Sequence, residues 1–237
     1  MRNYNESLKH IEENQYLISM VPASELLRLG CELGLNEKSR VLDLCCGYGT
    51  VLKVWAEAFN ISGTGVDQSK EFLHIGKKRL KQSNVTTIDL IHKDVNKYKD
   101  NTKYDVVICS ETIDSIENTF VLGEKFLKEG GTLLFQRVYS LLEEVPAELD
   151  EFDGGVYPIS KLNGIFNGLG YYITNLATGT ENDWNRYYTS SVRRELGKLR
   201  QKPDDKEKKA WLNEWNRMYF KYRMPYENQA MFCLQKL

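Results

Sequence analysis

The sequence predicts an α/β fold in which a mostly parallel, doubly wound sheet carries helices on both faces. Short apolar runs such as Val41–Leu44 and Tyr104–Cys109 have the length and composition of buried strands. Segments with helical spacing, such as Thr50–Phe59 and Lys70–Gln82, follow such runs. Strands that alternate with helices in this way form a parallel sheet whose ligand lies at the carboxyl ends of the strands. The 237 residues suit a single domain of this kind.

The stretch VLDLCCGYGT, residues 41–50, combines a buried strand, a turn of small residues and the start of a helix. Gly47 and Gly49 permit positive φ angles or a close approach of the backbone to a ligand. The helix that follows points free N–H groups and a positive dipole end at that ligand. Asp43 lies inside the strand, where an unpaired carboxylate is costly and an ammonium partner would compensate it. The loop therefore indicates a ligand with one negative and one positive end.

Two interpretations of this loop compete. The dinucleotide fingerprint G-x-G-x-x-G requires a third glycine where this chain has Leu52, and it gives Asp43 no role. The alternative is a nucleoside that carries an amino acid. VLDLCCGYGT resembles motif I of the class I S-adenosylmethionine (SAM) methyltransferases, written hhDhGCGxG with h for an apolar residue. The matching positions are Asp43, Cys46, Gly47 and Gly49, and Cys45 replaces the first glycine.

Acidic residues follow two later predicted strands. The run 61–66 ends at Asp67, where a carboxylate can accept hydrogen bonds from both hydroxyls of a ribose. Asp67 could instead cap the next helix, but Ser69 is also able to do so. A strand predicted over 85–91 leads to Asp94 at the same edge of the sheet.

The resemblance to SAM methyltransferases assigns further roles around the cofactor. It implies that Gln68 lies against the adenine and that Asp94 accepts from the exocyclic amine. The N–H of Val95 would then reach a ring nitrogen. Ser110 follows the predicted strand 104–109, at the place where motif IV of the family meets cofactor and acceptor.

The segments after residue 115 complete the predicted sheet. A helix over about 117–128 is followed by the phrase LKEGGTLLF, which resembles the L-K-P-G-G turn of the family and leads to a strand over 132–135. Residues 137–158 form a long irregular segment and a candidate functional loop. Further strands are predicted over 171–178 and 230–234. The resemblance implies a Rossmann-like sheet of seven strands, with the last strand antiparallel and inserted beside the fifth.

Two helical regions are predicted outside this core. Residues 1–36 form an N-terminal helical cap that either covers the sheet or contributes Tyr4, Tyr16 and Met20 to a lid. Residues 179–228 join two strands that need only a short turn, and they hold three of the four tryptophans. Their spacing predicts two helices separated near Pro203. We expect this insertion to be a helical lid over the substrate, and an accessory helix pair is the alternative.

Composition excludes several classes of protein. The net charge of −1 gives no overall attraction to nucleic acid or to anionic membranes. No apolar run approaches the roughly 20 residues of a membrane helix, and the N-terminus does not resemble a signal peptide. The five cysteines form an odd set, which favours reduced thiols and a cytoplasmic location. No second Cys/His pair has zinc-like spacing, so we expect no metal site.

The sequence as a whole predicts a SAM-dependent methyltransferase. The resemblance covers residues 38–140, which would form the SAM-binding core of one domain spanning residues 1–237. A looser similarity favours the small-molecule, ubiquinone-biosynthesis-type branch, and therefore in-line methyl transfer to a small organic acceptor. Candidates for a general base are Glu111, Tyr139 and Tyr157. The alternatives are an RNA methyltransferase, a non-catalytic SAM-binding regulatory module and a nicotinamide oxidoreductase. The sequence specifies neither an acceptor atom nor an oligomeric state.

Overall fold

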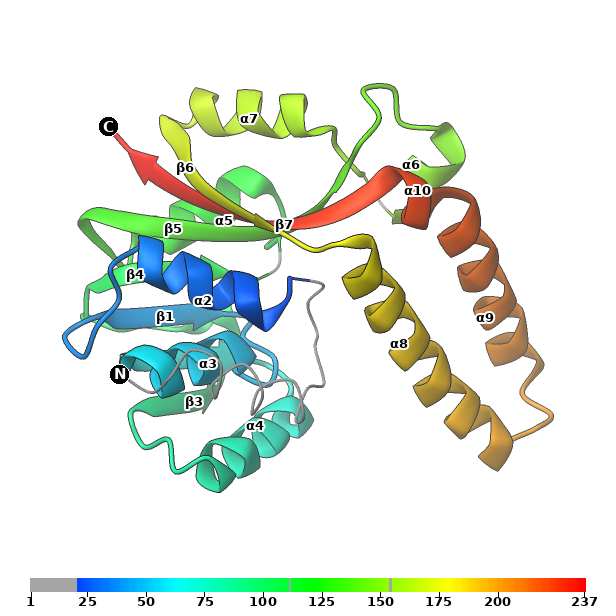
Figure 1. Ribbon diagram of the computed structural model, residues 1–237, viewed down its shortest axis with the longest axis horizontal. Coiled ribbons are helices and arrows are strands. Elements are labelled where there is room, and N and C mark those ends of the chain that lie inside the picture. Colours follow the sequence, from blue (N-terminus) through cyan, green and yellow to red (C-terminus); the bar gives the residue numbers. More distant parts are fainter. Residues whose placement is uncertain (1–20, 111, 154) are drawn as a thin grey trace.

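Seven strands of the described chain pair in the order β3-β2-β1-β4-β5-β7-β6 (Figure 1). The computed structural model describes residues 21–110, 112–153 and 155–237. Tyr4, Tyr16, Met20 and the predicted base Glu111 therefore lie outside the described residues. The strands are β1 Arg40–Leu44, β2 Ser62–Asp67, β3 Ile88–His92, β4 Tyr104–Cys109, β5 Leu127–Ser140, β6 Tyr171–Thr178 and β7 Glu227–Lys236.

Helices cover both faces of this sheet and extend beyond one end of it (Figure 1). The α-helices are α2 Ala23–Glu32, α3 Thr50–Phe59, α4 Lys70–Gln82, α5 Ile116–Glu124, α6 Ala147–Asp153, α7 Ile159–Gly168, α8 Glu181–Gln201, α9 Lys206–Met218 and α10 Met224–Tyr226. A short 3₁₀ helix, η1, spans Val95–Lys97, and a π-helical segment, η2, spans Tyr219–Arg223. No helix in the described ranges is long and apolar enough to cross a membrane.

The pairing of the strands confirms the predicted Rossmann-like topology. Strands β1 to β5 run parallel to one another, and β7 lies antiparallel between β5 and β6. Because β5 and β6 are both antiparallel to β7, they point the same way. The carboxyl ends of β1 to β6 therefore meet at one edge of the sheet, which we call the carboxyl edge. The insertion between β6 and β7 leaves from this edge.

Two hydrophobic cores lie on opposite faces of the sheet. One contains the buried side chains of α2 and α3, and the other those of α5 and α7. The indole N–H of Trp55 in α3 donates to the carbonyl oxygen of Leu26 in α2 at 2.7 Å. Gly30 of α2 faces Phe59, where an added Cβ would meet the ring at 2.2 Å. The missing side chain at Gly30 thus allows α2 to pack closely on α3.

The fifth strand is longer than the sequence predicts. It begins at Leu127, because α5 ends at Glu124 rather than near residue 128, and it continues to Ser140. The Gly-Gly turn becomes an irregularity inside the strand, where Gly130 has a φ of +69° and the register with β4 shifts. The first residues of the predicted irregular segment 137–158 are also strand, because β7 pairs with β5 as far as Ser140. Only this long-range pairing distinguishes them from a loop.

The insertion forms the two helices that the sequence predicts, separated near Pro203. Helices α8 and α9 run side by side away from the sheet, and η2 and α10 lead back to β7 (Figure 1). We call residues 181–226 the helical arm. Trp184, Tyr188 and Tyr219 form a separate hydrophobic cluster in it, with Val138 of β5 packed against them. The base of the arm is therefore joined to the end of β5.

Candidate functional site

The loop between β1 and α3 has a backbone conformation that few residue types favour. Cys45, Gly47 and Gly49 all have left-handed φ angles, of 62°, 55° and 67°. Gly49 is also the N-cap residue of α3, and it brings no side chain to bond the first N–H groups of that helix. These N–H groups can bind an anionic group of a ligand. Cys45 takes the conformation that glycine would adopt at this place in the motif.

Two glycines outside the loop allow it to lie against the sheet. An added Cβ at Gly65 of β2 would stand 2.7 Å from the sulfur of Cys46. An added Cβ at Gly76 of α4 would stand 2.5 Å from the carbonyl oxygen of Tyr48. Cys46 is buried in this contact, and burial raises the pKa of its thiol. Cys46 therefore fills the turn as a small neutral side chain.

All five cysteines are free thiols. None of the five, all of which lie in the described ranges, forms a disulfide. The described residues contain no cluster of His, Cys, Asp and Glu that could hold a metal ion.

Asp43 is a buried acid at the centre of the carboxyl edge. Its carboxylate is 1% exposed and accepts one hydrogen bond from the hydroxyl of Ser110 at 2.9 Å. Burial, with a smaller contribution from the nearby carboxylate of Asp67, raises the pKa of Asp43 from 3.8 to about 7, against the opposing effect of the hydrogen bond from Ser110. A cationic group of a ligand would compensate this carboxylate. The structure thus brings together two residues that the sequence assigned to the cofactor.

Asp67 ties the loop to the end of β2. One carboxylate oxygen accepts from the N–H of Gly47 at 2.8 Å, and the other accepts from the N–H of Ser69 at 2.7 Å. Ser69, not Asp67, caps α4, because its hydroxyl oxygen accepts from the N–H of Phe72. Each oxygen of Asp67 retains a lone pair that can accept from a ligand hydroxyl. The bond to Gly47 could not be foreseen from the sequence, because it depends on the path of the loop.

The end of β3 lies beside the end of β2. The N–H of Lys93 donates to the carbonyl oxygen of Asp67, and the imidazole Nε2 of His92 lies 3.0 Å from the carbonyl oxygen of Gln68. Asp94 is half-exposed and caps η1 by accepting from the N–H of Asn96 at 3.0 Å. The next residue, Val95, is buried. The predicted ribose and adenine residues therefore occupy neighbouring strand ends.

Arg137 is a central residue of the carboxyl edge that the sequence did not single out. Its guanidinium donates to the hydroxyl of Thr112 at 2.5 Å and to the carbonyl oxygen of Gly155 at 2.8 Å. It also lies 5.5 Å from the ring centre of Tyr157. Lys161 approaches the same ring at 3.9 Å. Arg137 thus joins the ends of β4 and β5 to the loop that carries one predicted base.

Tyr139 lies in a different environment from Tyr157. It is buried in the core on the α5 and α7 face, with its ring 6.2 Å from that of Phe232. Burial raises the pKa of its hydroxyl, while a hydrogen bond with Asn228 lowers it. The higher pKa makes this phenol a weaker acid at neutral pH than an exposed tyrosine. Of the two tyrosines, Tyr157 is the one that lies beside positive charge.

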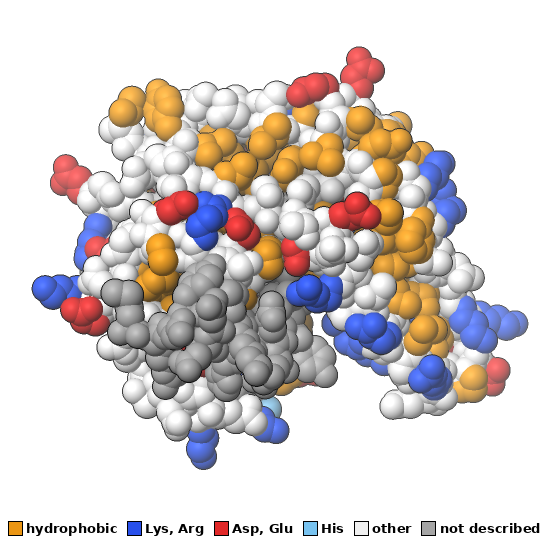
Figure 2. Space-filling model, in the orientation of Figure 1, with side chains coloured by type: hydrophobic (Ala, Val, Ile, Leu, Met, Phe, Trp, Pro, Cys, Tyr) orange, Lys and Arg blue, Asp and Glu red, His pale blue; other side chains and the backbone are white. Residues whose placement is uncertain are grey.

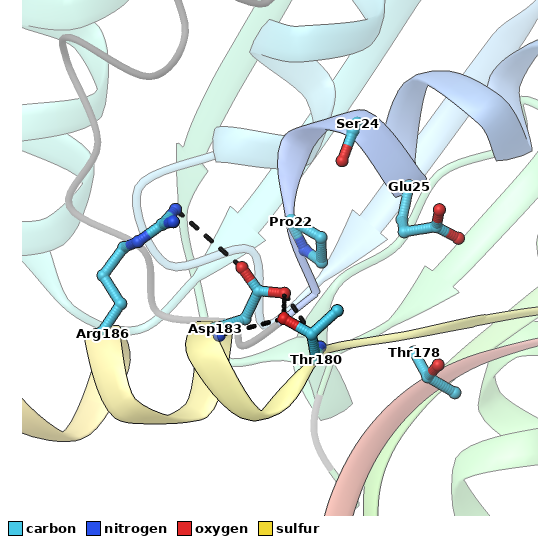
Figure 3. A pocket seen from close by; sticks show the side chains of 7 residues that line it. All are labelled: Pro22, Ser24, Glu25, Thr178, Thr180, Asp183 and Arg186. Atoms are coloured by element: carbon cyan, nitrogen blue, oxygen red, sulfur yellow. Dashed lines mark hydrogen bonds and ion pairs between the residues drawn. The ribbon is translucent and has the colours of Figure 1, made fainter.

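A hollow of about 420 Å³ opens where α2 begins, β6 ends and α8 begins (Figure 3). It is lined by Pro22, Ser24, Glu25, Thr178, Thr180, Asp183 and Arg186. Thr180 and Asp183 form a capping box at the start of α8, and Asp183 lies 3.9 Å from the guanidinium of Arg186. The capping box could be recognised in the sequence. The hollow could not, because its three segments are far apart in the chain.

Comparison with known proteins assigns the chain to a family. A family described as "Methyltransferase domain" matches residues 35–190. The uncharacterized protein YjhP of Escherichia coli is 29% identical over 219 residues, which cover 87% of this chain and 88% of YjhP. Its crystal structure, at 25% identity, superposes with a TM-score of 0.85 over 98% of this chain and 100% of that one.

Two further proteins extend the comparison. A SAM-dependent methyltransferase from Geobacter sulfurreducens, solved with S-adenosyl-L-homocysteine, has a TM-score of 0.86 at 24% identity, with both chains covered completely. The (S)-tetrahydroprotoberberine N-methyltransferase of Eschscholzia californica is 30% identical over 99 residues, which cover 41% of this chain and 28% of that protein. With the family match spanning more than half of the chain, and with the sheet order and loop described above, the chain belongs to the class I SAM-dependent methyltransferases.

Proposed function

We propose that this methyltransferase transfers a methyl group from SAM to a small organic acceptor by in-line displacement. The observation that carries the proposal is the buried carboxylate of Asp43, whose pKa is raised to about 7 by burial. An α-ammonium group of the cofactor would supply a positive charge for this acid, which no cation among the described residues neutralises. The same interaction would fix the amino-acid end of the cofactor beside the loop.

The residues around Asp43 suit the remaining parts of the cofactor. The turn formed by Cys45, Cys46, Gly47 and Gly49 would surround its amino-acid part, with N–H groups of α3 facing the carboxylate. Asp67 would accept from the ribose hydroxyls. At the neighbouring strand end, Gln68, Asp94 and Val95 would contact the adenine. Ser110 already holds the carboxylate of Asp43 in place.

The protein's part in the reaction is mainly to position the reactants. When bound, the cofactor supplies a methyl group activated by its sulfonium, and the acceptor's lone pair displaces the thioether. Holding donor and acceptor in line can contribute about 7–11 kcal/mol. Where the acceptor must lose a proton, we favour Tyr157 among the described candidates, because Arg137, which joins Thr112 to the loop at Gly155, lies against its ring. Tyr139 and Glu111 are the other candidates.

A small acceptor is supported by the size and chemistry of the carboxyl edge. The hollow beside α8 has about 420 Å³, which is within the usual range for small-molecule sites. The Eschscholzia californica relative described above is an N-methyltransferase of (S)-tetrahydroprotoberberine. We propose that the base of the helical arm closes over the acceptor, since Thr180, Asp183 and Arg186 of that region line the hollow.

Titration calorimetry with S-adenosylhomocysteine tests the cofactor site. We expect Asp43→Asn to weaken binding roughly 10- to 100-fold at pH 8, because a charge-assisted hydrogen bond is worth about 1.5–3 kcal/mol. Asp89→Asn is the matched control, since Asp89 is an exposed acid on β3. Unchanged affinity in Asp43→Asn would contradict the proposed role.

Turnover with a panel of acceptors tests the reaction. Amines, phenols, carboxylic acids and a transfer RNA are each incubated with SAM, and release of S-adenosylhomocysteine is measured. We expect release with a small organic acceptor. Methylation of the RNA alone would favour the RNA methyltransferase. Tight binding without release from any acceptor would favour a regulatory module.

A further inference from the structure

A buried carboxylate lines the hollow beside α8. Asp183 is 7% exposed, and its Oδ2 accepts from the N–H of Thr180 at 2.8 Å and from the hydroxyl of Thr180 at 2.6 Å. The other oxygen, Oδ1, lies 3.9 Å from the guanidinium of Arg186, which is beyond hydrogen-bond distance. Figure 3 shows the carboxylate directed from α8 toward the start of α2. The capping box therefore occupies one oxygen and leaves Oδ1 able to accept from a ligand in the hollow.

A second acid, Glu25 of α2, lines the same hollow. Its Oε2 accepts from Nε and Nη2 of Arg28 at 2.9 Å and 2.7 Å. The same guanidinium also pairs with Glu32 at 2.6 Å and donates to the carbonyl oxygen of Leu176 at 2.7 Å. One cation thus serves two carboxylates, so Arg28 only partly compensates the negative charge that Glu25 brings to the hollow.

The described residues that line the hollow carry more negative than positive charge. Two of them are acids, Glu25 and Asp183, and one is a cation, Arg186. The side chain of Arg186 is 56% exposed, so water screens its attraction to Asp183. The arm as a whole is basic: residues 181–226 contain twelve Lys and Arg residues against seven Asp and Glu residues, and the cations are spread over it (Figure 2). The hollow is therefore a local acidic region at the base of a basic arm.

We infer that the hollow binds an ammonium group of the methyl acceptor and that Asp183 selects for this group. The inference rests on the proposed transfer to a small acceptor. An ammonium group donates up to three hydrogen bonds, and a charge-assisted bond to a carboxylate oxygen such as Oδ1 is roughly twice as strong as a neutral one. A protonated amine has no lone pair to receive the methyl group, so this ammonium anchors the acceptor while another of its atoms reacts.

An anionic group would fit the hollow less well. The N–H groups of Thr180 and Asp183 at the start of α8 are already bonded within the capping box, so these two donors are not open to an anion. An anion would also meet the carboxylates of Asp183 and Glu25. A hydroxyl group could donate to Oδ1, but it would bring no charge of its own. For one acceptor skeleton, the expected order of affinity is therefore ammonium, then hydroxyl, then carboxylate.

Two matched series of small molecules test this order. Tyramine, tyrosol and hydroxyphenylacetate share a phenol and end in an ammonium, a hydroxyl and a carboxylate, and butylamine, butanol and butyrate repeat the series without a ring. Each is titrated into the full chain saturated with S-adenosylhomocysteine, and its binding is followed by NMR of the small molecule. We expect each amine to bind about tenfold more tightly than its neutral counterpart, and the carboxylates to bind most weakly.

Variants at the hollow test the role of Asp183. Asp183→Asn keeps the shape of the side chain, and it should weaken binding of tyramine about tenfold while leaving that of tyrosol unchanged. Asp205→Asn is the matched control, because Asp205 also caps a helix of the arm, α9, but does not line the hollow. Arg186→Gln should have the opposite effect and tighten binding of tyramine about threefold, because it removes the exposed cation beside Oδ1.

A second pair of variants separates the charge of the hollow from the pairing of Arg28. Glu25→Gln and Glu32→Gln each remove an acid that pairs with Arg28, but only Glu25 lines the hollow, so only Glu25→Gln should weaken binding of tyramine. Urea unfolding checks that each variant folds. No binding of either amine, equal binding of an amine and its neutral counterpart, or an undiminished preference in Asp183→Asn would overturn the inference. Release of S-adenosylhomocysteine from the acceptor panel is measured separately, so a failure of methyl transfer is distinguished from a failure of ammonium binding.

Discussion

The loop after β1 and the helical arm are built on opposite principles. The loop is held by backbone groups in close contact, such as the N–H of Gly47 on Asp67 and the carbonyl of Tyr48 above Gly76. The arm is held by side-chain contacts within and between its helices, such as the three cations around Glu195 and the buried, stacked rings of Tyr188 and Tyr219. The loop therefore has almost no steric freedom, whereas in the arm an added Cβ at Gly197 would meet no atom within 4 Å.

The two regions also differ in how the charge of a buried acid is compensated. In the loop, a carboxylate is buried without a cation from the described residues that would neutralise it, which leaves a place for a charged ligand. In the arm, Glu195 is buried but surrounded by cations, and the pKa of its carboxyl is lowered to about 2 because their hydrogen bonds outweigh burial. The two acids thus differ in whether described cations compensate their burial, as they do for Glu195 and do not for Asp43.

The largest expected effect is on the free energy of unfolding, which ionisation of the buried Asp43 lowers. The pKa of Asp43 is about 7 in the folded protein, against an ordinary value of 3.8. Between about pH 4 and pH 7 the folded state without cofactor therefore keeps a proton that the unfolded state has lost, and the free energy of unfolding falls as the pH rises through this range. Asp43→Asn removes this loss. We expect it to stabilise the free protein more at pH 8 than at pH 5, by up to about 3 kcal/mol. Urea unfolding at both pH values measures this, and an equal effect at each would contradict the raised pKa.

A substitution at Gly76 tests the steric side of the comparison. An added Cβ there meets the backbone oxygen of Tyr48 at 2.5 Å, and a backbone atom cannot move aside as the end of a side chain can. We expect Gly76→Ala to destabilise the protein by about 1–3 kcal/mol, despite the better helix propensity of alanine. It should also weaken binding of S-adenosylhomocysteine. Wild-type stability in urea would show that the loop can shift.

The matched substitution in the arm should have the opposite sign. Gly197 also lies inside a helix, α8, but an added Cβ there meets no atom within 4 Å. We expect Gly197→Ala to stabilise the protein by about 0.5–1 kcal/mol, because alanine loses less backbone entropy in a helix. Thermal or urea unfolding measures it. Destabilisation would reveal a contact at the open side of the arm.

The smallest expected effect is a gradient of hydrogen exchange along α8. Amides near Trp184 and Tyr188 should exchange more slowly than those near residues 198–201, because the first two side chains pack on Tyr219 at the base of the arm. If the base is part of a lid, S-adenosylhomocysteine and acceptor should slow exchange there further. Protection that neither ligand changes would assign the arm to the scaffold.

The sequence by itself determined the fold class and selected the residues that we propose for the cofactor. Buried strands and the helices between them could be placed within a few residues, because hydrophobic spacing is a local property. The bounds of β4, α4 and β6 agree with prediction at both ends. Asp43 and Asp67 could be selected because a carboxylate at the end or in the middle of an apolar strand is unusual and needs a partner.

Tertiary structure decided the features that depend on residues far apart in the chain. The length of β5 follows from its pairing with β7, and the position of Arg137 follows from that extension. The hollow beside α8 needs three separate segments, which bring Glu25 and Asp183 to the same site. Local patterns fix what a segment becomes, but only packing in three dimensions fixes which segments meet and which surfaces stay open.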